Sequence, residues 1–174
     1  MQALYRGIPL LHHPVLRLAE VCDEVVVVLA PGADPADLPE GVRVVHDPTE
    51  GEGPLAGAHA GLLAAVRSDV AVIAGGDMPG LEPAVLRLMV AAAEEGSVDA
   101  VVLRDGDTDR PLPLVVRTWP AAEMAHALLH AGRRSLRELA RALQTTVIEE
   151  RAWTALDPER RTLLDVDEPA DLEA

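Results

Sequence analysis

Short apolar runs mark the first half of the chain, and the two longest show no alternation with polar residues. They are VVVVL at residues 25–29 and VAVIA at residues 70–74, with a shorter, mostly apolar stretch at residues 42–45 between them. A strand that is apolar at every position has both faces covered, as in a parallel sheet packed between two layers of helices. These stretches therefore predict buried strands.

Segments with helical spacing separate the predicted strands. Residues 8–21 place Leu11 and Leu18 on one side of a helix, and residues 54–66 are rich in Ala and Leu. Another helix is predicted over residues 82–94, where apolar side chains again recur at helical intervals. Strands that alternate with helices predict an α/β fold, here a three-layer sandwich with a mostly parallel sheet. A length of 174 residues is typical of a single domain.

The second half of the chain has a different pattern. Two apolar runs flank the polar segment DGDTDRP, whose Asp105 and Gly106 are a turn signal and predict a β-hairpin. The predicted elements are strands over residues 99–104 and 112–117, helices over 120–129 and 135–143, a strand over 145–148, a short apolar piece over 162–166 and a helix beginning in DEPADL at 167–172. No repeat, low-complexity tract or linker divides this pattern into two domains.

Composition and charge exclude several classes of partner. The net charge is −14 and all 15 basic residues are Arg, so the chain lacks the basic surface that binds nucleic acid. No apolar run approaches the roughly 20 residues of a membrane span. Cys22 is the single cysteine, which excludes a disulfide framework and fits a reducing, cytoplasmic location.

The first candidate for chemistry is Asp77, which follows the predicted strand 70–74 through Gly75 and Gly76. Ligands of open parallel sheets bind just beyond the carboxyl ends of the strands. Two glycines leave the backbone bare there, and a free carboxylate suits Mg²⁺ held together with substrate phosphates. The alternative is that Asp77 only caps the helix that begins after Pro79.

The second candidate is the segment GPLAG at residues 53–57. A glycine-rich loop that runs into a helix offers backbone N–H groups and the positive end of the helix dipole to an anion. The alternative is that this segment is only a turn followed by a helix that packs in the core. The spacing of Gly51, Gly53 and Gly57 is not that of a dinucleotide-binding fingerprint.

Five motifs in one order carry a family resemblance. They are GPLAG at 53–57, GGDMP at 75–79, RPLPLVVR at 110–117, RRSLREL at 133–139 and DVDEPADL at 165–172. Together they resemble the molybdenum cofactor guanylyltransferases, within the sugar-nucleotide type of nucleotidyltransferases. The resemblance runs from about residue 3 to the end of the chain, and its combination of motifs is more specific than any one of them.

The resemblance implies a Rossmann-like α/β domain that transfers GMP from GTP to molybdopterin with Mg²⁺. It implies that Asp77 is the catalytic and metal-binding acid. Residues it places against the nucleotide or the pterin are Gly53, Pro54, Leu55, Ala56, Gly57, Gly76, Asp165 and Asp167. The implied partners are small molecules and molybdoenzyme maturation proteins, and the expected state is a monomer or weak homo-oligomer.

The chain departs from this family at its start. Relatives begin with a strand and a signature of roughly LAGGxSxRMGxxK, which holds the nucleotide phosphates, and here Met1 stands where that signature ends. Either the native chain is longer, or this is a short form impaired in nucleotide binding. We favour the first, since loss of a central strand leaves two strand edges unpaired. A folded chain is then expected to close the gap between residues 25–29 and 70–74.

Other functions and sites remain open. A cytidylyltransferase or another small-molecule nucleotidyltransferase of the same family is one alternative, and a non-catalytic protein that binds the pterin or a partner is another. His126 and His130 are one helical turn apart, as in a zinc pair, but no third ligand is evident. Four arginines are candidates to bind anionic substrates, and we expect one of them to do so. They are Arg110, Arg133, Arg134 and Arg137.

Overall fold

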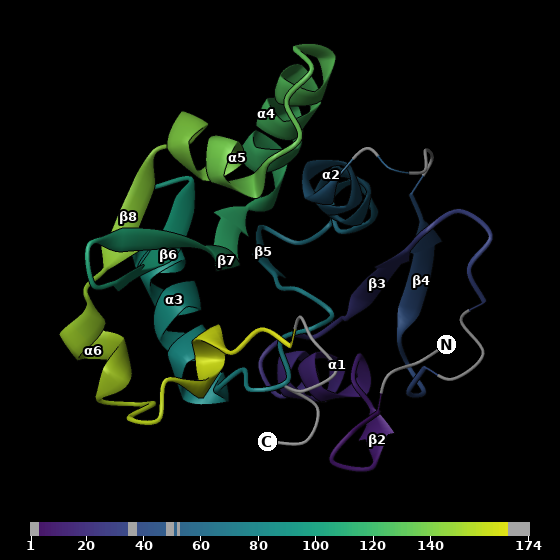
Figure 1. Ribbon diagram of the computed structural model, residues 1–174. Coiled ribbons are helices and arrows are strands. Elements are labelled where there is room, and N and C mark those ends of the chain that lie inside the picture. Colours follow the sequence, from purple (N-terminus) through teal and green to yellow (C-terminus); the bar gives the residue numbers. More distant parts are fainter. Residues whose placement is uncertain (1–3, 35–37, 48–50, 52, 167–174) are drawn as a thin grey trace.

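The computed structural model describes residues 4–34, 38–47, 51 and 53–166 (Figure 1). Its strands are β1 (Leu4–Tyr5), β2 (Ile8–Pro9), β3 (Val26–Leu29), β4 (Arg43–His46), β5 (Val70–Ile73), β6 (Ala100–Asp105), β7 (Thr108–Arg117) and β8 (Thr145–Ile148). Its helices are α1 (His12–Ala19), α2 (Pro54–Ala64), α3 (Pro83–Glu95), α4 (Thr118–His130), α5 (Leu136–Ala142) and α6 (Glu150–Thr154), with a 3₁₀ turn, η1, at Arg161–Leu163. Asp167 and the helix predicted after it lie outside the described residues.

The described strands form one four-stranded sheet and two separate pairs. The large sheet has the order β5–β7–β6–β8, β3 pairs with β4 in parallel, and β1 with β2 is a small hairpin. Strand β7 runs antiparallel to both β5 and β6, whereas β8 is parallel to β6. The predicted three-layer α/β sandwich is confirmed, and its sheet is mixed because the predicted hairpin places β7 between β5 and β6.

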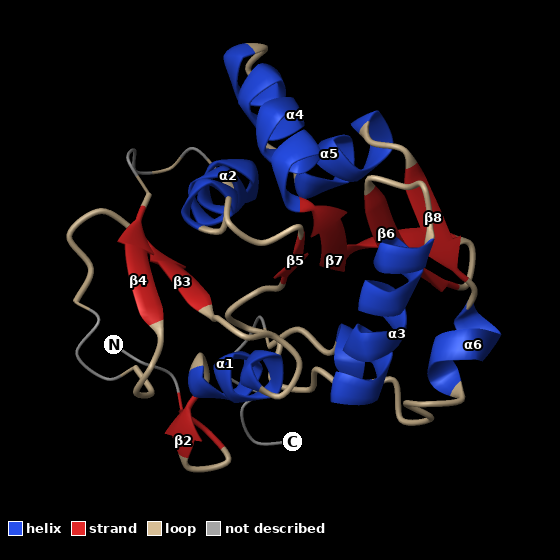
Figure 2. Cartoon of the chain, turned by 180° about the vertical axis from the view of Figure 1, so that it is seen from behind, coloured by secondary structure: helices blue, strands red, loops and turns tan. Residues whose placement is uncertain are grey.

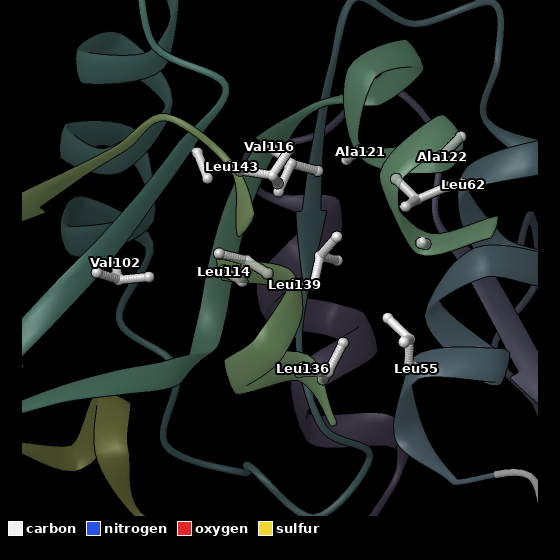
Figure 3. Close-up of a cluster of buried hydrophobic side chains, with 12 residues drawn as sticks. Leu55, Leu62, Val102, Leu114, Val116, Ala121, Ala122, Leu136, Leu139 and Leu143 are labelled. Carbon is white, nitrogen blue, oxygen red and sulfur yellow. The ribbon is translucent and has the colours of Figure 1, made fainter. Parts of the chain in front are cut away.

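One face of the large sheet is covered by α2, α4 and α5, as Figure 2 shows from behind. Val102 of β6 and Leu114 and Val116 of β7 belong to one buried cluster on this face with Leu55 of α2 and Leu139 of α5 (Figure 3). Each of these leucines is fully buried, and burial of one such side chain stabilises the fold by about 1.5–3 kcal/mol.

The opposite face of the sheet is covered by α3 and α6. Val101 and Leu103 of β6, with Val115 of β7, form the second cluster with Met89 of α3 and Trp153 of α6. Neighbouring residues of β6 and β7 thus point to opposite faces, and both sets are buried. This arrangement confirms that the central strands are covered on both sides.

The gap predicted between the strands at 25–29 and 70–74 is present and is not closed by any described strand. β3 and β5 belong to different sheets, and a cavity of about 800 Å³ is lined by residues of both. Helix α1 bridges the two sides instead: its Leu18 packs against the cluster of Val15, Val25 and Val27 and also against the cluster of Met78, Leu81 and Leu86. The expectation that a folded chain closes this gap is therefore wrong for the described residues.

Two local features differ from the sequence prediction. The first helix begins at His12 and not at residue 8, because the chain turns back at Arg6 and Gly7, both at positive φ, to form the β1–β2 hairpin. Helix α6 was not predicted. It buries Trp153, whose indole N–H donates to the carbonyl of Arg104 at 2.7 Å.

Candidate active site

The loop after β5 presents Asp77 at the carboxyl end of the strand. Met78 and Leu81, each 1% exposed, anchor the loop in the core. Asp77 comes just before Met78 in the chain and is half-buried. The N-cap of α3 is Glu82, and no side chain caps that helix by a hydrogen bond. The structure therefore does not support the alternative that Asp77 is only a helix cap.

The carboxylate of Asp77 folds back against Gly75. A Cβ atom at position 75 would collide with Oδ1 of Asp77 and lie 3.3 Å from Cγ of Met78. Gly75 and Gly76 also line the cavity between β3 and β5. The missing side chain at Gly75 thus provides the space in which the Asp77 carboxylate lies, while the cavity itself is lined by Gly75 and Gly76 and not by Asp77.

We expect Gly75→Ala to displace the Asp77 carboxylate and to lower nucleotidyl transfer, while stability changes by at most about 1 kcal/mol, because the colliding atom is the end of a side chain that can rotate. Gly106→Ala is the comparison: a Cβ there meets no atom within 4 Å, but the positive φ of Gly106 strains the substitution. It should therefore lower stability and leave the transfer rate unchanged. Chemical denaturation and a transfer assay of both variants test this expectation, and a Gly75→Ala protein with an unchanged rate contradicts it.

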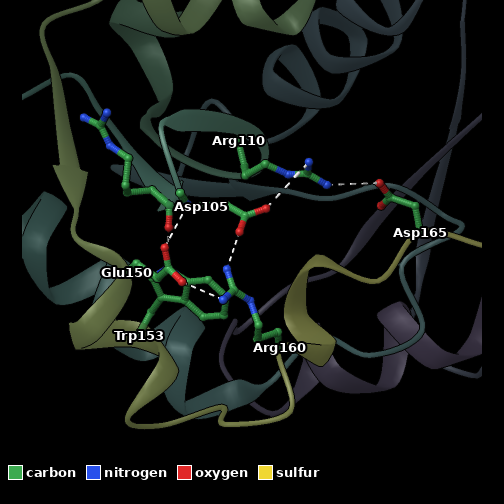
Figure 4. Close-up of polar contacts among 8 residues, drawn as sticks. Asp105, Arg110, Glu150, Trp153, Arg160 and Asp165 are labelled. Atoms are coloured by element: carbon green, nitrogen blue, oxygen red, sulfur yellow. Dashed lines mark hydrogen bonds and ion pairs between the residues drawn. The ribbon is translucent and has the colours of Figure 1, made fainter.

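The chain near its carboxyl end is tied to the same loop. The N–H of Val166 donates to the carbonyl of Asp77 at 2.9 Å. The Asp165 carboxylate lies 3.8 Å from Nη2 of Arg110, and Nη1 of Arg110 is 3.8 Å from Asp105 (Figure 4). The structure thus brings Asp77 and Asp165 together through the backbone, with the Asp165 carboxylate paired to Arg110.

Asp105 also takes part in a second group of contacts, with Arg160, Glu150 and Gly106, which we call the brace. Arg160 pairs with Asp105 and, at 2.5 Å, with Glu150 (Figure 4). The N–H of Gly106 donates to Glu150 at 2.8 Å, and this bond, followed by Arg160, lowers the pKa of the Glu150 carboxyl. The brace links the β6–β7 hairpin to α6 and so fixes the chain that leads to Asp165.

The GPLAG segment is docked on the loop that precedes α5. The N–H of Leu55 donates to the carbonyl of Arg134 at 3.1 Å, and a Cβ at Gly53 would lie 3.2 Å from that oxygen. Leu55 and Ala56 are buried in the core, whereas Pro54 and Gly57 line the cavity. Of the predicted residues in this segment, Pro54 and Gly57 therefore share a cavity with Gly76, and the Leu55 N–H is already used within the protein.

Asp47 is a site candidate that the sequence analysis missed. A Cβ at Gly57 would lie 3.9 Å from Oδ2 of Asp47, so this carboxylate is beside the GPLAG segment. Asp47 follows β4 directly, and its N–H donates to the carbonyl of Leu29 at 2.8 Å. The available signal was an acid immediately after a short apolar strand, whereas Asp77 follows its strand through Gly75 and Gly76.

Most candidate arginines are held by groups of the protein. Arg133 pairs with Glu138 at 2.8 Å, and Arg134 donates to the carbonyl of Leu129 at 3.1 Å. Arg110 lies 3.8 Å from each of its two carboxylate partners, which is longer than a charge-assisted hydrogen bond. Among these three, Arg110 is the one held most loosely.

The described part of the chain has no group of three or more His, Cys, Asp or Glu side chains that could hold a metal by itself. The histidines His126 and His130 are included in this statement, and their ring centroids lie 4.4 Å apart in an edge-to-face arrangement. His59 is also included, and its pKa is lowered by burial and by His126. Mg²⁺ is commonly bound by one or two carboxylates together with substrate phosphates and water. A half-buried carboxylate such as Asp77 fits that kind of site.

Comparison with known proteins places the chain in a family. The MobA-like NTP transferase domain matches residues 1–147. This chain belongs to the MobA-like NTP transferase family. A probable molybdenum cofactor guanylyltransferase of Mycobacterium avium is 34% identical over 168 residues, which are 95% of this chain and 79% of that protein. One from Chloroflexus aggregans is 30% identical over 169 residues, 96% of this chain and 79% of that protein.

Solved structures confirm the sugar-nucleotide transferase type of fold. Molybdopterin-guanine dinucleotide biosynthesis protein A of Archaeoglobus fulgidus superimposes with a TM-score of 0.78 at 20% identity, over 99% of this chain and 86% of that chain. The 2-C-methyl-D-erythritol 4-phosphate cytidylyltransferase of Thermus thermophilus gives 0.69 at 16% identity, over 98% and 88%. This member of the MobA-like family is a nucleotidyltransferase. Among the described residues, the structure contains no helix with the length and apolar character of a membrane span.

Proposed function

We propose that this chain transfers GMP from GTP to molybdopterin with Mg²⁺. The observation that carries the proposal is the Asp77 carboxylate, which lies after β5 against Gly75, a residue that lines a cavity together with Gly76, Pro54 and Gly57. The names of the relatives from Mycobacterium avium and Chloroflexus aggregans support guanylyl transfer.

The chemistry follows from the residues around this carboxylate. A phosphate oxygen of the acceptor attacks the α-phosphorus of GTP, the bond to the bridging oxygen breaks, and pyrophosphate leaves with the electron pair. Mg²⁺, when bound, supplies charge neutralisation on the phosphates. Asp77 would hold the ion, and the backbone without side chains at Gly75 and Gly76 would let the phosphates approach. No general base is needed, since the nucleophile is already an anion.

The remaining residues bind and orient the two substrates in this proposal. Gly53 to Gly57 lie against the nucleotide, mainly through Pro54 and Gly57, because Leu55 and Ala56 are buried. The family resemblance places Asp165 on the pterin side, and it gives the same role to Asp167, which lies outside the described residues. We also propose that the protein acts in the cytoplasm as a monomer or weak homo-oligomer and delivers its product to molybdoenzyme maturation proteins.

Thermal unfolding in Mg²⁺ with GTP or with CTP tests the choice of base. We expect GTP at about 100 times its Kd to stabilise the protein by roughly 2.7 kcal/mol, and CTP at the same concentration to stabilise it far less. The corresponding assay follows labelled GMP from GTP onto molybdopterin. A larger shift with CTP contradicts the guanylyl assignment and favours a cytidylyltransferase, a class with which this chain shares its fold. No shift with either nucleotide favours a non-catalytic short form.

A further inference from the structure

The loop that carries Asp77, residues 77–82, is held by a segment that comes about 80 residues later in the chain. This segment spans residues 157–166 and includes the 3₁₀ turn η1, and we call it the clamp segment. Figure 1 shows it in yellow beside the end of α3 that adjoins the loop. It contacts the loop at its beginning, in its middle and at its end.

The first two contacts are made by the backbone of the clamp segment. At the beginning of the loop, the N–H of Val166 donates to the carbonyl of Asp77 at 2.9 Å. In the middle, a Cβ atom at Gly80 would collide with the carbonyl oxygen of Arg161, so the two backbones touch there. A shift of the clamp segment would therefore move the peptide group of Asp77 itself.

The third contact is made by the side chain of Thr162 at the end of the loop. The N–H of Glu82 donates to the hydroxyl oxygen of Thr162 at 3.2 Å, and Thr162 is fully buried. Glu82 is the N-cap residue of α3, and no side chain caps that helix by a hydrogen bond of its own. The Thr162 hydroxyl thus fixes the point at which the loop meets the helix.

The clamp segment is in turn fixed by the buried carboxylate of Asp157. This residue is 2% exposed, and its Oδ2 accepts the N–H of Thr162 at 2.7 Å. Its own N–H donates to the carbonyl of Trp153 at 3.0 Å, which ties the start of the segment to α6. Asp157 therefore sets the backbone position of Thr162 relative to the core.

Stability alone is a poor explanation for a carboxylate at this place. Oδ1 of Asp157 is buried and has no hydrogen-bond partner among the described residues. Burial of a carboxylate with one oxygen left unpaired costs free energy. The geometry that Asp157 imposes on Thr162, and through it on the loop with Asp77, is the gain that offsets this cost.

We propose that Asp157 and Thr162 are positioning residues for the Asp77 carboxylate. Asp157 fixes Thr162, the Thr162 hydroxyl fixes the end of loop 77–82 at α3, and Val166 fixes its beginning at Asp77. Neither positioning residue touches metal or substrate. The inference rests on the proposed function, in which Asp77 holds Mg²⁺.

This role predicts a specific kinetic signature. A loop that has lost one of its supports places the Asp77 carboxylate less well, and loss of such support weakens metal binding by about tenfold or more. High Mg²⁺ then restores the occupied site, so the Mg²⁺ concentration for half-maximal rate should rise about tenfold while the rate at saturating Mg²⁺ stays within about threefold. A purely structural role lowers the fraction of folded protein and leaves the half-maximal concentration unchanged.

Thr162→Val and Thr162→Ser are a matched pair that tests the role of the hydroxyl. Val has nearly the same size as Thr but no oxygen to accept the N–H of Glu82, whereas Ser keeps that oxygen. We expect Thr162→Val to weaken Mn²⁺ binding about tenfold and Thr162→Ser to change it less than about threefold. Electron paramagnetic resonance of Mn²⁺ with a non-hydrolysable GTP analogue measures binding directly, and the transfer rate as a function of Mg²⁺ gives the second readout.

A second matched pair tests Asp157. Asp157→Ala removes the acceptor for the N–H of Thr162 and should weaken Mn²⁺ binding about tenfold, whereas Asp157→Asn keeps an oxygen acceptor and should bind Mn²⁺ within about threefold of the natural protein. If Asp157→Ala does not fold, the Thr162 pair decides. Equal Mn²⁺ affinity of Thr162→Val and the natural protein overturns the proposal.

Two further variants distinguish this proposal from its alternatives. Leu139→Ala removes a fully buried side chain of α5 outside both the loop and the clamp segment, so it should lower stability and leave Mn²⁺ affinity unchanged. An equal loss of affinity in Leu139→Ala and Thr162→Val overturns the positioning role. If Asp77→Asn binds Mn²⁺ as the natural protein does, the proposed function fails and this inference with it. If Asp77→Asn loses Mn²⁺ and Thr162→Val does not, only the positioning role fails.

Discussion

Replacing Asp77 by Asn is expected to lower the rate of nucleotidyl transfer about 1,000-fold, which corresponds to roughly 4 kcal/mol of transition-state stabilisation. Asn keeps the shape of the side chain in the space left by Gly75 but removes the charge that would hold Mg²⁺ against the triphosphate. Stability should change little, since Asp77 is half-buried and its backbone carbonyl still accepts the N–H of Val166. Single-turnover transfer with labelled GTP measures the effect.

The matched control is Asp107→Asn. Asp107 is exposed at the tip of the β6–β7 hairpin. Loss of one surface charge there should leave the rate within about twofold, because the charge of an exposed side chain is screened by solvent and salt. If Asp77→Asn retains more than a tenth of the transfer rate, Asp77 does not hold the metal.

Removing the Trp153 side chain should cause the largest loss of stability in the chain. Trp153 is fully buried in the second core cluster, and its indole N–H bonds to the Arg104 carbonyl at 2.7 Å. Trp153→Ala is expected to lower the free energy of unfolding by about 3–5 kcal/mol, which combines lost apolar burial with a cavity. Because α6 also carries the brace to the segment before Asp165, binding of the acceptor should weaken as well.

Two further variants separate the contributions at Trp153. Trp153→Phe keeps most of the apolar volume and loses the bond to Arg104, so it should cost about 1–3 kcal/mol, the usual penalty for an unsatisfied buried group. Trp119→Ala is the control, because Trp119 is 58% exposed and should change stability by at most about 0.5 kcal/mol. Urea unfolding curves compare the three proteins. Equal midpoints for Trp153→Ala and Trp119→Ala would show that α6 contributes little to the fold.

The elements that the sequence predicted well are those with a continuous local pattern. Residues 25–29 and 70–74 are uninterrupted apolar runs, and strands formed at both places. Helix α6 was missed because its five residues, ERAWT, are too few to show a helical period. Its position depends on Trp153 meeting the Arg104 carbonyl, a contact 49 residues apart in sequence.

Long-range contacts likewise explain what was missed in the candidate site. Asp77 was recognised because its strand, glycines and acid are consecutive. Asp47 was not, since its place beside Gly57 depends on the pairing of β4 with β3. The location of the gap followed from the family resemblance. That β5 pairs with β7 depends on the return of the chain through the β6–β7 hairpin, a contact between segments about 40 residues apart.

The most direct test of metal binding at Asp77 is anomalous X-ray scattering from a crystal soaked with Mn²⁺ and GTP. We expect a manganese peak within coordination distance of the Asp77 carboxylate, with the nucleotide phosphates beside Gly75 and Gly76. Bound GTP with manganese at the Asp105–Glu150 acids, or with no peak at Asp77, would contradict this assignment.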